Sequence, residues 1–284
     1  MVSIPCSKCR RECSAEFLGT YLLVLFGAGS VIVSTVMKGF DALIFVAAIF
    51  GGTVMLAIVL LGKHSGAHIN PAVTIAHAFA RRTRDDLILP YLCFQGLGAV
   101  LAALTLRMFF LNESVFPADL GSTELARGVN PLYGIVIEMI GTFVLCSAAL
   151  TATFYVRKRL MRAALVGGTL FFLILLFAPL TGASFNPARS IGPALWSWHW
   201  SGVYVYLIGP LIGAVFAALL FKLIENAKKS ERLLCLCSNA LQWKRVGRVT
   251  QINHQKRRIE EIAHIGRGQL GEIKTREEEN YQSR

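Results

Sequence analysis

Two short segments of the chain share the sequence Asn-Pro-Ala, at Asn70-Pro71-Ala72 and at Asn186-Pro187-Ala188. Asn is a strong N-cap residue and Pro is favoured at the first helical position, so each segment predicts the start of a helix. The Asn amides can donate hydrogen bonds, and two helix N-termini together carry partial positive charge. If the two segments meet, they can hold the oxygen of an uncharged solute and repel cations.

Four ionisable side chains in or beside long apolar runs are further candidates: Glu16, His68, Glu138 and Arg189. Such groups are costly inside a membrane and are functional-site hypotheses by default. Arg189 would donate to solutes and repel cations. The matching positions of Glu16 and Glu138 favour a structural role, in which they accept backbone N–H groups of the Asn-Pro-Ala loops. The alternative is a proton relay in a proton- or ion-coupled transporter. His68 either lines the cytoplasmic vestibule or fixes its loop.

Catalytic chemistry is not indicated. The sequence has no phosphate-binding loop, no G-x-S-x-G and no His pair at metal spacing in a suitable setting, so we expect no enzyme activity, cofactor or metal. His64 and His77 are interpreted as structural. Cys6, Cys9 and Cys13 lack a fourth zinc ligand nearby, and we expect solvated or lipid-modified thiols on an N-terminal tail.

The elements that position these residues are membrane helices. The chain has 284 residues, 54% hydrophobic and 16% charged, with a mean hydropathy of +0.54. About 20 apolar residues cross a bilayer. Apolar runs predict six spans, near residues 15–36, 41–62, 88–111, 131–154, 162–180 and 203–225. This pattern predicts an all-α polytopic membrane protein and excludes a soluble enzyme or a disulfide scaffold.

The sequence contains an internal repeat of two similar halves. Residues 65–76 match residues 181–192, and Glu16-x-x-Gly19 matches Glu138-x-x-Gly141. Each half holds three spans, so the second half must enter the membrane from the opposite side, as an inverted repeat. After each Asn-Pro-Ala, about ten residues precede a polar or kinked segment, which predicts two half-helices that meet near the midplane. The loop carbonyls before them would form a ladder of acceptors along a pore.

Charge placement predicts the topology. Basic residues follow the second span and join the fourth to the fifth, which places both termini in the cytoplasm. We expect the protein in the plasma membrane. We divide the chain into a tail (1–14), a channel domain (15–226, with repeats at about 15–111 and 131–225) and a basic tail (227–284). The basic tail is either solvated or binds anionic lipid or a regulatory protein; nucleic-acid binding is not expected. Asn112 begins a glycosylation sequon.

The two Asn-Pro-Ala segments and the Glu-x-x-Gly-Thr repeats resemble the aquaporin (major intrinsic protein) family over about residues 12–226. The resemblance implies a right-handed bundle of six transmembrane helices with two re-entrant half-helices. It also implies a homotetramer in the lipid bilayer, with one pore per subunit, that passively transports water or small neutral solutes. A closed-pore junction protein remains an alternative.

The resemblance also implies a selectivity filter, carried over by spacing to Phe50, Ile174, Ala183 and Arg189. Strict water channels of the family usually have His where this chain has Ile174, so the ring is expected to be wider and less polar. Ser190 and Ala194, in contrast, resemble water-type members. We expect water permeation together with glycerol or other small neutral solutes.

Overall fold

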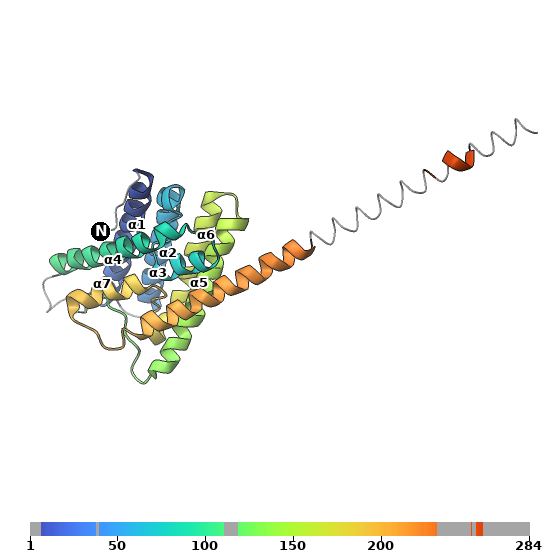
Figure 1. Ribbon diagram of the computed structural model, residues 1–284. Coiled ribbons are helices and arrows are strands. Elements are labelled where there is room, and N and C mark those ends of the chain that lie inside the picture. Colours follow the sequence, from blue (N-terminus) through green and yellow to red (C-terminus); the bar gives the residue numbers. More distant parts are fainter. Residues whose placement is uncertain (1–6, 38–39, 111–118, 232–250, 252–253, 258–284) are drawn as a thin grey trace, which may run out of the picture. The chain divides into compact units, whose positions relative to one another are not determined.

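The structure is a computed structural model (Figure 1). It describes residues 7–37, 40–110, 119–231, 251 and 254–257. Within these ranges every regular element is a helix. The sequon at Asn112, the thiol of Cys6 and most of the basic tail lie outside the described residues.

Six helices are long and apolar enough to cross a membrane, and two are about half as long. The long ones are α1 (Ser7–Ser34), α2 (Phe40–Ser65), α4 (Asp85–Phe109), α5 (Pro131–Tyr155), α6 (Arg159–Thr181) and a last helix with the span Val205–Glu231. The short ones are α3 (Pro71–Phe79) and α7 (Pro187–Ser197). This order confirms the predicted polytopic fold, with one half-helix in each half of the chain.

The first helix departs from the expectation. It begins at Ser7, well before the predicted start at residue 15. Cys9 and Cys13 are four residues apart, so they share one helix face, and both are buried against Leu87 and Tyr91 of α4. The expectation of solvated thiols at these two positions was therefore wrong. The charged residues between the cysteines hid the start of the helix from a hydropathy argument.

The long helices pack closely where small residues meet. α1 packs on α2 and α4, and α2 packs on α6. A Cβ at Gly51 would lie 2.7 Å from the Gly167 carbonyl oxygen, so these helices cross backbone to backbone. Gly98 lies in the same way against the Phe17 carbonyl. α7 lies beside α4, while α3 contacts α4 and α5 (Figure 1).

The outer faces of the long helices are apolar. Leu60 and Leu176 are among many large apolar side chains that remain exposed. Such a surface would be a liability in water and suits a bilayer. The chain divides into two units, Met1–Leu223 and Ile224–Arg284. Everything described below belongs to the first unit.

Candidate pore and its lining

Both half-helices start as the sequence predicts. The Asn70 side chain caps α3, with Oδ1 accepting the Ala72 N–H at 2.8 Å. The Asn186 side chain caps α7, with Oδ1 accepting the Ala188 N–H at 3.0 Å and the Arg189 N–H at 3.3 Å. A proline follows each cap, at a position where its missing N–H has no helical partner to lose.

The two caps also bond across the halves. Nδ2 of Asn70 donates to the Phe185 carbonyl at 2.8 Å, and Nδ2 of Asn186 donates to the Ile69 carbonyl at 3.1 Å. The structure therefore brings the two Asn-Pro-Ala segments together. An amide NH₂ group has two hydrogens, so each of these asparagines keeps one N–H beyond this cross-bond. Both asparagines line the same cavity.

The loops before the half-helices have an unusual backbone. Ala67 and Ile69 in the first loop, and Ala183 and Phe185 in the second, have φ between 46° and 52°. L-residues with side chains rarely adopt this left-handed region, and the strain persists only where the surroundings impose it. The alternation turns the backbone groups of each loop in opposite directions.

Two buried carboxylates impose this geometry. Glu16 accepts the His68 N–H at 2.9 Å and the Ile69 N–H at 2.6 Å. Glu138 does the same for the second loop, at 3.1 Å from the Ser184 N and 2.8 Å from the Phe185 N.

Neither glutamate is exposed, and neither lines the cavity. Their bonds to the loops favour the structural role over the proton relay. Tyr91 and Tyr206 add one bond each, donating to the carbonyls of Ser65 and Thr181 at 3.0 and 2.8 Å.

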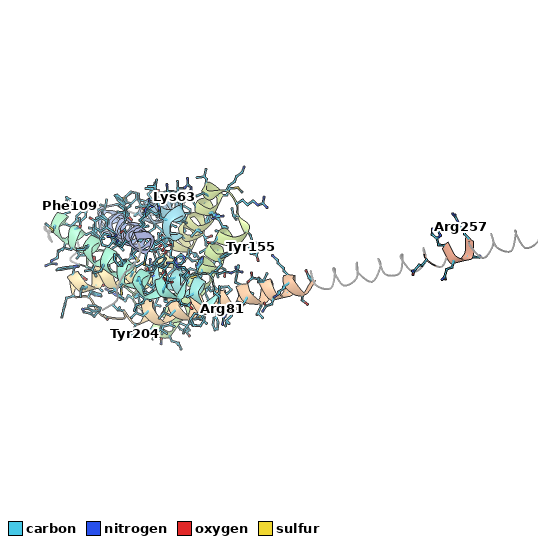
Figure 2. All side chains as sticks on the ribbon, turned by 45° about the horizontal axis from the view of Figure 1, so that its top comes forward. Lys63, Arg81, Phe109, Tyr155, Tyr204 and Arg257 are labelled. Atoms are coloured by element: carbon cyan, nitrogen blue, oxygen red, sulfur yellow. The ribbon has the colours of Figure 1, made fainter. Side chains whose placement is uncertain are left out.

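A cavity of about 310 Å³ runs along the inside of α2 and α6. Phe50 and Arg189 line one end, and Lys63, Arg159 and Arg162 line the other, which we call the basic mouth. Lys63 is labelled in Figure 2. Lys63 lies thirteen positions after Phe50 on the same helix, so the cavity extends over about 20 Å, or two-thirds of a bilayer core. Its volume holds several water molecules. Among the described lining residues there is no Asp or Glu.

The four residues expected to form the filter are all buried, but they do not all reach this cavity. Arg189 is 2% exposed, and its Nη1 donates to the Gly121 carbonyl at 2.8 Å. Its Cζ lies 5.2 Å from the centre of the Phe50 ring. Ile174 and Ala183 are buried nearby in the apolar core and are not among the cavity-lining residues that the structure describes.

Some carbonyls of the expected ladder already accept hydrogen bonds within the protein. Ser65 and Ile69, at the ends of the first loop, already accept bonds from Tyr91 and Asn186. The residues between them line the cavity, but of the second loop before its cap only Ser184 does. The sequence could not reveal this because the tyrosine bonds join residues distant in the chain.

The structure also places a residue that sequence reasoning missed. His77 was interpreted as structural, but it lines the cavity together with His68. Their ring centres are 4.4 Å apart. His68 is therefore both a lining residue and, through its backbone, part of the loop geometry. The signal in the sequence was the position of His77, seven residues after Asn70 and so on the same face of a half-helix.

Six membrane-capable helices, two half-helices capped by asparagine and a cavity between them define a membrane channel. The chain matches the family model "Major intrinsic protein" over residues 4–221. The chain belongs to this family and is thus an integral multi-pass channel for water and small solutes, not an enzyme.

Individual relatives agree with this placement. The chain is 35% identical to aquaporin NIP1-1 of Arabidopsis thaliana, with 82% of this chain and 80% of the relative covered. It is 33% identical to nodulin-26 of Glycine max, with 81% and 82% covered. The aquaglyceroporin of Plasmodium falciparum has a similar fold, with a TM-score of 0.68 at 24% identity, covering 75% of this chain and 95% of that one.

Proposed function

We propose that the chain conducts water and small uncharged solutes such as glycerol through this cavity, and that it excludes protons and ions. The observation that carries the proposal is the crossed pair of asparagine amides, Asn70 and Asn186, lining a cavity with no carboxylate among its described residues. A neutral solute with a lone pair is the ligand that such donors accept.

The same amides account for proton exclusion. A water oxygen that accepts from both Nδ2 groups uses its two lone pairs, so its own hydrogens point away toward both ends of the cavity. A proton cannot be handed along a file of waters whose donors reverse direction at the centre. The N-termini of α3 and α7 add partial positive charge at the same place, which disfavours any cation.

Solute size is set, in this proposal, by Phe50 and Arg189, which line the cavity, and Ile174 and Ala183, buried in the neighbouring core, complete the ring. The Arg189 guanidinium donates hydrogen bonds to a solute and repels cations. The Phe50 ring limits the width of the opening. An aliphatic side chain at Ile174 offers no hydrogen bond and leaves the ring apolar on one side, which favours the hydrocarbon backbone of glycerol.

Stopped-flow light scattering on reconstituted vesicles tests this function. We expect fast shrinkage in a gradient of an impermeant sugar, and shrinkage followed by fast re-swelling in a gradient of glycerol. Shrinkage without re-swelling would leave a water-selective pore. Rates equal to those of protein-free vesicles would overturn the open-channel proposal in favour of a closed-pore structural protein.

A proton- or ion-coupled transporter is the competing class. Its relay groups would be Glu16 and Glu138, which lie away from the cavity and already accept backbone hydrogen bonds. We expect solute flux to be independent of an imposed proton gradient and to carry no current. A current that follows the solute would support the transporter instead.

The assembly and placement of the protein complete the proposal. We infer a homotetramer in the plasma membrane, with the channel domain at 15–226 and both termini, including the basic tail, in the cytoplasm. The exposed apolar side chains support burial in lipid and in subunit contacts. Chemical crosslinking in membranes, and protease digestion of the tails in intact and permeabilised cells, test these points.

A further inference from the structure

Two imidazoles face one another inside the cavity, and solute conduction by itself does not require them. The His68 and His77 rings are tilted by 33° with their centres 4.4 Å apart. Their exposed fractions are only 8% and 3%, and both line the cavity. The matching residues of the second half, Ser184 and Pro193, have no imidazole.

The tautomer of His77 follows from its partners. Its Nδ1 lies 2.9 Å from the Val73 carbonyl oxygen, which can only accept, so Nδ1 carries the hydrogen. In the neutral ring Nε2 then carries a lone pair. The Thr153 hydroxyl oxygen lies 3.4 Å from it, but that hydroxyl donates to the Ala149 carbonyl at 2.9 Å. The lone pair on Nε2 of His77 therefore receives no hydrogen bond from Thr153.

His68 is fixed in the same tautomer. Its Nδ1 lies 3.2 Å from the Thr74 hydroxyl oxygen. That hydroxyl donates to the Asn70 carbonyl at 3.2 Å and accepts from Gln95 Nε2 at 2.9 Å. The Thr74 oxygen therefore accepts from Nδ1 of His68, and the lone pair of this ring is also on Nε2.

Imidazoles held in this way are typical metal ligands. A ligating His usually donates its other ring N–H to a neighbouring oxygen, which fixes both the tautomer and the ring orientation. A metal–nitrogen distance of 2.0–2.1 Å puts the metal about 3.2 Å from each ring centre. Two such ligands at a right angle, as in the square-planar sites of Cu²⁺ and Ni²⁺, have ring centres about 4.5 Å apart. The observed distance between the ring centres of His68 and His77 is 4.4 Å.

We propose that His68 and His77 bind a divalent transition-metal ion that accepts imidazole ligands at a right angle, such as Ni²⁺ or Cu²⁺, and that the bound ion blocks the cavity. Within the described residues no cluster of three or more His, Cys, Asp or Glu could hold a metal, so water completes the coordination. The basic mouth disfavours a cation, and the ion therefore binds when metal is abundant rather than as a permanent constituent. The blocking step rests on the proposed function, whereas binding does not.

Calorimetric titration with Ni²⁺ tests binding in the full-length protein, purified without a polyhistidine tag. We expect one Ni²⁺ site in the cavity of each subunit, and we expect both His77→Leu and His77→Gln to lose it. Two different substitutions are used because one of them could fail to fold, and thermal unfolding shows whether each variant is folded. His64→Leu and His199→Leu are the matched controls. His199 is the important one, because its Nε2 lies 2.6 Å from Glu124 and offers a competing surface site. Binding that survives both His77 variants, or that is lost in His199→Leu, would overturn the proposal.

Flux in the same preparations tests the block. With Ni²⁺ on both sides of the vesicle membrane, we expect wild-type water flux to fall to the protein-free level and each His77 variant to keep its own metal-free rate. Ni²⁺ binding that depends on His77 without any effect on an active channel would overturn the block. Ni²⁺ binding in a protein that never conducts would support the site and refute the proposed function, so the two failures are distinguishable.

Discussion

Glu16 in the first half and Glu138 in the second half each accept two successive backbone N–H groups of a re-entrant loop. Tyr91 and Tyr206 each donate to the carbonyl at the start of that loop. Among the side chains that line the cavity, Asn70 and Asn186 also match, but others differ between the halves. Three matched positions differ: His68 with Ser184, Val73 with Arg189, and His77 with Pro193.

The difference separates two kinds of requirement. Residues that agree between the halves hold a strained backbone, which either half needs equally. Residues that disagree make the cavity chemically asymmetric, with imidazoles toward the basic mouth and a guanidinium at the opposite end. An inverted repeat thus supplies a symmetric frame for a path whose two ends differ.

The largest effect should come from removing either matched carboxylate. Glu16→Ala and Glu138→Ala each leave buried N–H groups without an acceptor, at about 1–3 kcal/mol apiece. We expect both variants to lose most folded protein, to a similar degree, as judged by size-exclusion chromatography and thermal unfolding in detergent. Glu124→Ala, at a half-exposed site, is the control. A severe folding defect in only one of the two variants would contradict the equal roles of Glu16 and Glu138.

Making the halves alike at an unmatched position should change selectivity and leave the fold intact. Arg189→Val gives the second half the residue that Val73 provides in the first. Loss of a charged hydrogen-bond donor corresponds to about a tenfold change in a rate. We therefore expect the ratio of glycerol flux to water flux to rise by about that factor. We also expect a faster proton leak, which a trapped pH-sensitive dye measures. Arg189→Lys should keep most of the proton barrier. An unchanged glycerol-to-water ratio in Arg189→Val would contradict the filter proposal.

A smaller change in the opposite direction is expected from Gly27→Ala. A Cβ at Gly27 would overlap the Phe50 ring, which must then shift at the end of the cavity. Overpacking of this kind costs about 1–3 kcal/mol. If the ring moves inward, glycerol flux falls more than water flux, which the sugar and glycerol gradients measure separately. Gly52→Ala, where a Cβ meets nothing within 4 Å, is the matched control.

The smallest effect tests the symmetry of the frame most finely. Tyr91→Phe and Tyr206→Phe each remove one hydroxyl that donates to a loop carbonyl. We expect each to destabilise the protein by about 1 kcal/mol and the two shifts in Tm to be nearly equal. Tyr204→Phe, at a half-exposed position, should shift Tm less. Clearly unequal effects of the matched pair would show that one loop depends more on its tyrosine.

Much of the frame was predictable from local patterns. The Asn-Pro-Ala caps fixed the starts of α3 and α7, and long apolar runs located the six long helices. The start of α1 was missed, because Cys9 and Cys13 are buried by packing on α4 rather than by hydropathy.

The sequence predicted which residues belong to the site better than it predicted which of them contact one another. The bond from Asn70 to Phe185, and the facing of His68 and His77, arise from the way the loops and half-helices meet in space. The Asn70 bond joins the two halves, so no spacing rule within one half contains it. The residues carried over from the family, such as Ile174, also needed the structure to show that burial and contact with the cavity are different properties.

The crossed asparagine bonds have a consequence for synthesis. The Ile69 carbonyl receives its donor from Asn186, which lies 117 residues further along the chain. Ribosomes add about 5–20 residues per second, so the first loop waits roughly 6–23 s for its partner. During that interval the first three spans hold an unfinished polar turn at membrane depth. Newly made chains therefore pass through a half-built stage that the translocation machinery or its chaperones must shelter from lipid.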